Sequence, residues 1–200
     1  MTPSITVLDF GMGNLRSVAK ALERTGARVR VEETPSANTD ALVVPGQGAF
    51  GSCVANLGSR IDVIREWIAA ERPYLGICLG LQLLFERSQE SELPGAGVLA
   101  GEVVRLPGAV KIPHIGWNQV DPLASSRLFA GVDPGTYFYF VHSYYPVPAD
   151  AAVSAATTEY GLKFTCAAER GAMVATQFHP EKSGDAGRLV LENFVRMCSR

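Results

Sequence analysis

The chain has 200 residues, of which 47% are hydrophobic, and 18 Lys and Arg residues against 20 Asp and Glu residues give a formal net charge of -2. A chain of this size and composition can bury one sizeable core, so we expect a single domain over residues 1–200. The nearly balanced charge creates no field that would attract a nucleic-acid backbone or an anionic membrane, which argues against both as partners.

The N-terminal segment is typical of a first strand. Residues 5–8 are apolar and mostly β-branched, Asp9 interrupts them, and no basic region precedes them, which argues against a signal peptide. The longest uncharged apolar stretch, residues 73–85, is too short to span a bilayer and contains glycines. We therefore expect a cytoplasmic protein.

Strands and helices alternate in the first half, which predicts βαβ units around a parallel sheet. Asn14 can cap a helix that Gly26 ends. A second helix buries one face formed by Ile61, Ile64, Trp67 and Ile68. The expected strands are residues 5–8, 28–31, 41–44 and 74–77, with Pro45-Gly46 stopping the third, and residues 79–85 are expected to form a helix.

The second half consists of short segments separated by Gly and Pro, which predicts further strands, some of them antiparallel. These segments are residues 98–106, 136–141, 152–157 and 172–177. Asp185 is then expected to cap a final amphipathic helix.

The cysteines and histidines supply the candidate nucleophiles and bases: Cys53, Cys78, Cys166, Cys198, His114, His142 and His179. No two cysteines form a C-x-x-C pair, whereas zinc sites and secreted disulfide frameworks normally show close pairing. We therefore expect reduced thiols, no metal and no cofactor.

Cys78 has the most specific context, in Gly76-Ile77-Cys78-Leu79-Gly80 between a predicted buried strand and a predicted helix. This arrangement is typical of a nucleophile elbow, in which the glycines permit a tight turn. Unpaired N–H groups at the helix start would favour the thiolate and can hold an oxyanion. On its own, the pentapeptide fits a small buried core cysteine equally well.

His179-Pro180-Glu181 follows the last predicted strand. Residues two apart on an extended chain point to the same side, so Glu181 can reach the His179 ring and fix its tautomer. By itself, a His-x-Glu pair is more often an ordinary surface pair.

Two glycine-containing loops have alternative interpretations. Residues 45–48, Pro-Gly-Gln-Gly, can either offer a backbone N–H to an oxyanion or form a simple turn. Residues 11–17, with Glu32 and Glu33 downstream, partly match a dinucleotide-binding loop, but Ser17 replaces its third glycine. A nicotinamide site would also leave the Cys78 segment unexplained.

Residues 76–82, Gly-Ile-Cys-Leu-Gly-Leu-Gln, and 177–183, Gln-Phe-His-Pro-Glu-Lys-Ser, together resemble the two signatures of class I glutamine amidotransferases, in that family's order and spacing. Within this class the chain is similar to the glutaminase subunits of imidazole glycerol phosphate synthase, an enzyme of histidine biosynthesis. Four further segments carry that likeness, residues 9–14, 45–50, 113–118 and 140–144. The resemblance implies a three-layer α/β sandwich with a central, mostly parallel sheet and a nucleophile elbow.

The resemblance also implies roles for individual residues. Cys78, His179 and Glu181 would form a catalytic triad, and the N–H groups of Leu79 and Gly48 would form the oxyanion hole. The residues implied to bind substrate are Gly46, Gly48, Gln82, Ser143 and Tyr144. His114 and His142 would not act as bases. Gln47 departs from the family, which usually has an aliphatic residue there.

The implied reaction hydrolyses L-glutamine to glutamate and ammonia through a thioester on Cys78. Ammonium is no nucleophile, so ammonia must pass by a protected route to a partner, which in the family is a (β/α)₈-barrel cyclase subunit in a heterodimer. We expect the partner to dock over the active site and activate it. The expected interface residues are Asn14, Pro113, His114, Trp117 and Lys182, although Trp117 would also suit a core.

Three other functions compete with this interpretation. Glutaminase subunits of the anthranilate or pyridoxal phosphate systems share Cys, His and Glu, but residues 113–118 argue against them. A cysteine-elbow peptidase or chaperone-like protein would not hydrolyse glutamine steadily. A non-catalytic binding subunit would have no need for an intact triad.

Overall fold

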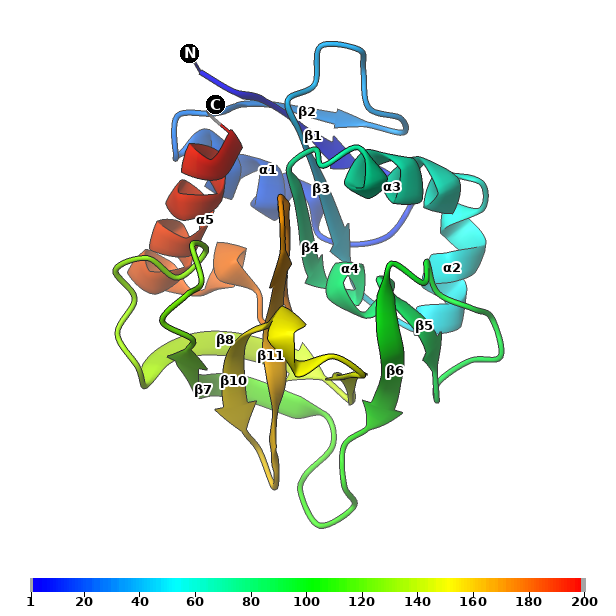
Figure 1. The fold of residues 1–200 in the computed structure, drawn as a ribbon, viewed down its shortest axis with the longest axis vertical. Helices are drawn as coiled ribbons and strands as arrows, with labels where there is room; N and C mark the ends of the chain where they lie inside the picture. Colours follow the sequence, from blue (N-terminus) through cyan, green and yellow to red (C-terminus); the bar gives the residue numbers. More distant parts are fainter. Residues whose placement is uncertain (1, 199–200) are drawn as a thin grey trace.

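A nine-stranded sheet forms the centre of the computed structural model, which describes residues 2–198 (Figure 1). Its strands, in the order in which they lie side by side, are β2 (Arg28–Glu32), β1 (Ser4–Leu8), β3 (Ala41–Gly46), β4 (Tyr74–Cys78), β12 (Met173–Thr176), β11 (Lys163–Arg170), β10 (Ser154–Glu159), β7 (His114–Pro122) and β8 (Thr136–His142). The strands from β2 to β12 pair in parallel, and those from β12 to β8 pair antiparallel.

A smaller sheet of three strands lies beside the main one. It consists of β5 (Phe85–Ser88), β6 (Leu99–Arg105) and β9 (Tyr144–Pro148), with β6 in the middle. Two short 3₁₀ turns, η1 (Ala151–Val153) and η2 (Pro180–Lys182), complete the connections.

Helices cover both faces of the parallel half of the main sheet, which gives the expected three layers (Figure 1). The apolar cluster on one face includes side chains of α1 (Leu15–Glu23) and α5 (Gly184–Cys198). The cluster on the other face includes side chains of α2 (Phe50–Leu57), α3 (Arg60–Ala69) and α4 (Leu79–Gln82). Successive residues of β3 alternate between the two clusters, since Val43 belongs to the first and Val44 to the second.

Several predicted boundaries are wrong, and the site depends on two of them. The helix after Cys78 is only four residues long, and Phe85 already begins β5. A fully buried apolar run has no periodicity that separates helix from strand. Pro45-Gly46 does not stop β3 either, because Gly46 pairs with Cys78 and so lies beside the elbow. Asp185 lies inside the first turn of α5, which begins at Gly184.

Helix α2 and strands β5, β7, β9 and β11 were not predicted from the sequence. In β7 the alternation is hidden, because the outward-facing Ile115 and Trp117 are themselves apolar and exposed. Among the helices of residues 2–198, none has the length and apolar character needed to cross a membrane.

Candidate active site

Cys78 occupies the turn between β4 and α4 with φ 56° and ψ -105°, a conformation that L-residues rarely adopt. A Cβ atom at Gly80 would lie 1.9 Å from the carbonyl oxygen of Val44, so only glycine fits there. This geometry confirms the predicted nucleophile elbow. The one-turn α4 provides a much smaller helix dipole than expected, so the argument for a stabilised thiolate must come from neighbouring groups.

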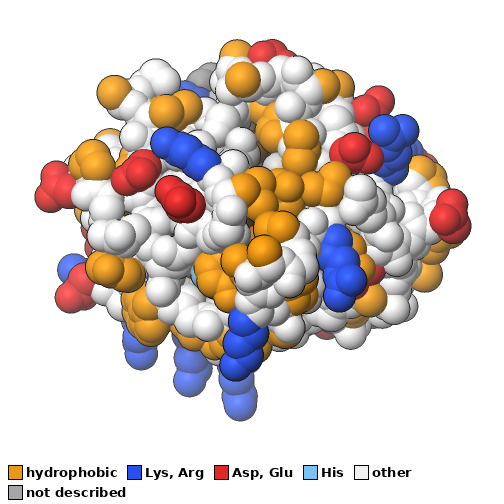
Figure 2. Space-filling view, turned by 90° about the horizontal axis from the view of Figure 1, so that it is seen from below, with side chains coloured by type: hydrophobic (Ala, Val, Ile, Leu, Met, Phe, Trp, Pro, Cys, Tyr) orange, Lys and Arg blue, Asp and Glu red, His pale blue; other side chains and the backbone are white. Residues whose placement is uncertain are grey.

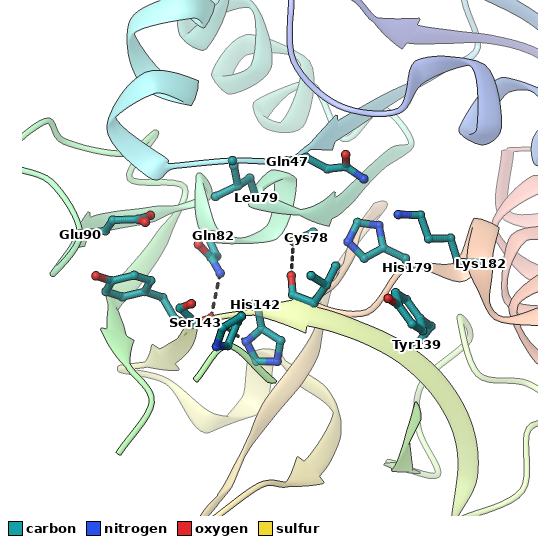
Figure 3. A pocket seen from close by; sticks show the side chains of 14 residues that line it. Gln47, Cys78, Leu79, Gln82, Glu90, Tyr139, His142, Ser143, His179 and Lys182 are labelled. Carbon is teal, nitrogen blue, oxygen red and sulfur yellow. Dashed lines mark hydrogen bonds between the residues drawn. The ribbon is translucent and has the colours of Figure 1, made fainter. Parts of the chain in front are cut away.

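His179 and Glu181 form a buried pair beside the elbow. The Nδ1 atom of His179 lies 2.8 Å from Oε1 of Glu181, and the two side chains are 2% and 1% exposed. The Nε2 atom of His179 is buried without a hydrogen-bond partner among the described residues, and Figure 3 shows the ring directed towards Cys78. Glu181 therefore fixes the ring through one nitrogen and leaves the other for chemistry.

The protonation of His179 reflects these neighbours. Burial alone lowers the pKa of His179, but the interactions with Cys78 and Glu181 outweigh it and raise the pKa to about 9. Because the groups are coupled, this value describes their shared titration. At neutral pH the imidazole carries its proton.

A pocket of about 350 Å³ opens over Cys78 (Figure 3). Its size is within the range typical of small-molecule sites. Seven predicted site residues line it, namely Gly48, Cys78, Leu79, Gln82, Ser143, Tyr144 and His179. Glu181 lies behind His179 and lines a different hollow. Gly46 is buried beneath the pocket wall.

The Gly46–Gly48 segment passes close to the elbow. A Cβ atom at Gly46 would lie 2.5 Å from Cβ of Leu79, and Gly48 has φ +102°. Leu79 is the first residue of α4, so its N–H has no partner within the helix. Two backbone segments thus meet beside the Cys78 sulfur at the place where an oxyanion hole is needed.

Several lining residues were missed by the sequence analysis. Glu90 lines the pocket and accepts a hydrogen bond of 2.8 Å from the backbone N–H of Phe50. It lies in an irregular segment, so no periodic signal places it there. Tyr139 and Val141 come from β8 and also line the pocket. Gln177 contacts Cys78 and could have been found, because it stands two residues before His179.

The residues expected at a partner interface divide into two groups. Asn14, Pro113 and Lys182 are exposed, and Trp117 is 54% exposed rather than part of a core. Pro113 and Lys182 also line the pocket. His114 is only 3% exposed, so its side chain does not reach the surface where a partner would dock.

The remaining cysteines have no contact with the pocket. Cys53 and Cys166 are fully buried, Cys198 is partly buried, and all are free thiols. Burial raises the pKa of Cys53 and of Cys198 to about 12 and raises that of Cys166 further. Among residues 2–198, no three His, Cys, Asp or Glu side chains gather as a metal-binding group.

Comparisons with known proteins agree with the site geometry. The family model described as glutamine amidotransferase class-I matches residues 6–198. The imidazole glycerol phosphate synthase subunit HisH of Syntrophotalea carbinolica is 48% identical over 205 residues, covering 96% of this chain and all of the relative. The same subunit of Mycobacterium tuberculosis is 52% identical over 204 residues, covering 96% and 97%.

Two solved structures share the fold at low sequence identity. PurLQS from Thermotoga maritima superposes with a TM-score of 0.78 at 18% identity, covering 98% of this chain and 99% of that one. A putative GMP synthase protein from Thermoplasma acidophilum gives 0.75 at 21% identity, covering 100% and 95%.

Proposed function

The chain belongs to the class I glutamine amidotransferase family, and on this premise we propose that it is the glutaminase subunit of an imidazole glycerol phosphate synthase. It hydrolyses L-glutamine and delivers the ammonia to a cyclase subunit, which makes imidazole glycerol phosphate and the aminoimidazole carboxamide ribonucleotide. The single observation that carries the enzymatic role is the unpartnered Nε2 of His179, buried beside Cys78 and held from behind by Glu181.

The pocket offers groups that suit the two ends of glutamine. Gln82, Ser143 and Tyr144 can hydrogen-bond the amino-acid end. The Glu90 carboxylate, already fixed by the N–H of Phe50, can pair with the substrate's ammonium. This arrangement directs the side-chain amide of glutamine towards Cys78.

Chemistry then proceeds in two steps. The Cys78 sulfur attacks the side-chain amide carbon, and the N–H groups of Leu79 and Gly48 stabilise the oxyanion. His179, protonated at neutral pH, gives its proton to the departing ammonia. Water, activated by the now neutral His179, hydrolyses the thioester to glutamate.

The partner would dock on the side where the pocket opens. Figure 2 views the molecule from the end that carries β7, β8 and β10 in Figure 1, and hydrophobic side chains gather across the middle of that face. The large hydrophobic side chains exposed on β7 and β8 are Ile115, Trp117 and Tyr137. Such side chains suit the anchors of a heterodimer interface. A covering partner would also protect ammonia from water.

The cytoplasm is the proposed location. All four cysteines are free thiols, which suits a reducing compartment.

The proposal is tested by reconstituting the reaction. The chain is mixed with a cyclase of the (β/α)₈-barrel type and its nucleotide substrate, and glutamate and imidazole glycerol phosphate are measured with glutamine as nitrogen source. The cyclase by itself, supplied with an ammonium salt at alkaline pH, serves as control. Equal formation of glutamate and imidazole glycerol phosphate supports the proposal. Turnover with an anthranilate synthase or pyridoxal phosphate synthase partner, but not with the cyclase, would assign the chain to another synthase.

A further inference from the structure

A chain of buried amide groups connects the substrate pocket to the nucleophile. The Nε2 atom of Gln82 lies 2.9 Å from the carbonyl oxygen of Tyr144 and 3.0 Å from Oε1 of Gln177. The Nε2 atom of Gln177 lies 3.6 Å from Sγ of Cys78. Gln82 is 3% exposed and Gln177 is fully buried, so water does not replace these contacts.

The direction of the chain is fixed by its first member. The Tyr144 carbonyl can only accept, so Gln82 must present its NH₂ group on that side. The same NH₂ group faces Gln177, which must therefore present its oxygen to Gln82. The remaining end of Gln177, the end that faces the sulfur, is then its NH₂ group. Gln177 donates a hydrogen bond to Cys78 and cannot accept one from it.

This donor matters because of what else surrounds the sulfur. The carbonyl oxygen of Val141 lies 4.0 Å from Sγ and favours the neutral thiol, which can donate to it. The NH₂ group of Gln177 favours the thiolate, since a donor gains strength when its acceptor becomes charged. The titratable neighbours that interact with Cys78 are His179, after β12, and Cys53, on α2.

We propose that Gln177 is a positioning residue that stabilises Cys78 as the thiolate and ties the sulfur to Gln82 at the substrate pocket. Both N–H bonds of the Gln82 amide are used within the chain of amides, so its oxygen is the group left for the substrate. A substrate N–H that bonds to this oxygen would polarise both amides and strengthen the donor at the sulfur. This inference rests on the proposed function only in treating Cys78 as the nucleophile.

The test measures the thiolate directly. Iodoacetamide alkylation of Cys78 is followed by mass spectrometry from about pH 5 to about pH 10. Gln177→Glu keeps the acceptor for Gln82 and removes the donor to the sulfur, whereas Gln177→Met removes both. We expect alkylation at neutral pH to slow about tenfold in both variants, with the pH profile displaced upwards, and further in Gln177→Glu because of its charge.

Gln119→Glu, on the exposed side of β7, is the matched control and should leave the profile unchanged. Thermal unfolding identifies any variant that fails to fold, and either Gln177 variant alone then suffices. Profiles that coincide with the wild type would overturn the proposal. A variant alkylated faster at every pH would also overturn it, because Gln177 would then merely shield the thiol. Absence of glutamine hydrolysis by the wild-type complex would refute the proposed function without affecting this alkylation result.

Discussion

His114 and His142 face each other at paired positions of β7 and β8, with Nδ1 of His114 3.0 Å from Nε2 of His142. Nδ1 of His142 lies 2.9 Å from the carbonyl oxygen of Tyr144, to which it must donate. Nε2 of His142 therefore accepts a hydrogen bond from His114, and both rings are neutral. Burial lowers the pKa of His114 to about 4 and, together with its neighbours, that of His142 to about 3.

This pair should make the protein less stable in acid. Both histidines have folded-state pKa values below the unfolded value near 6.5, so the unfolded chain binds more protons as the pH falls below 6.5. Each histidine then reduces the free energy of unfolding by about 1.4 kcal/mol per pH unit until its folded-state pKa is reached. Urea denaturation at about pH 7 and about pH 5 measures this loss. His114→Phe should reduce the dependence on pH, and an unchanged slope would contradict the assignment.

Cys78→Ala should abolish glutamine hydrolysis and leave the fold and partner binding intact. The substitution removes the sulfur and nothing that holds the elbow, whose shape depends on Gly80. We expect turnover to fall by at least about a thousandfold. Glutamate release by the variant in complex with the cyclase is the measurement, and size-exclusion chromatography checks the complex. Near-normal hydrolysis would refute the triad.

A glutamine-like electrophile, such as a diazo-ketone analogue, should label Cys78 ahead of the other three cysteines. Cys78 faces the pocket, whereas Cys53 and Cys166 are fully buried and the pKa values of Cys53, Cys166 and Cys198 are raised by burial. Peptide mass spectrometry after partial labelling gives the order. Equal labelling of all four would leave Cys78 with no special reactivity.

Glu181→Gln should cost less activity than His179→Ala. The amide can still hydrogen-bond Nδ1 of His179, whereas loss of the ring removes both proton transfers. We expect the loss in kcat to be about ten- to a hundredfold smaller for Glu181→Gln. Because Glu181 helps to raise the pKa of His179 to about 9, the alkaline decline of activity should also move to lower pH in this variant. Equal losses for the two variants would contradict the assigned roles.

The sequence predicted those parts of the site that depend on neighbours along the chain. The elbow follows from the glycines around Cys78, and the contact of His179 with Glu181 follows from the spacing of two residues. The parallel strands were found because their apolar runs are short and separated by helices or turns.

The missed parts depend on contacts between distant segments. Val141 reaches the Cys78 sulfur because β8 crosses the pocket, and Glu90 reaches the pocket through the loop after β5. No local pattern encodes such proximity. The length of α4 was also hidden, since Leu83, Leu84 and Phe85 are buried whether they form a helix or a strand.

The isolated chain should be nearly inactive and should be activated by its partner. The pocket opens beside exposed Pro113 and Lys182, so a docked partner would contact the active-site rim directly. Lys182 also lies with Nζ 5.9 Å from the centre of the Tyr139 ring, which places its charge at that rim. Activation can occur if docking selects the orientation of the Gly46–Gly48 peptides that aims an N–H at the oxyanion.

The size of the effect and the role of Gln47 can both be measured. One missing oxyanion donor costs about a hundred- to a thousandfold in rate, so a change of one peptide orientation is large enough to act as a switch. Gln47 lines the pocket within this segment, and its polar side chain can hold either orientation, whereas an aliphatic residue cannot hydrogen-bond. Glutamine turnover is therefore measured for the wild type and for Gln47→Val, each alone, with the cyclase, and with the cyclase plus its nucleotide ligand. We expect turnover to rise in that order, and a different basal rate in Gln47→Val would assign the resting state to Gln47. Equal rates in all three conditions would exclude activation by the partner.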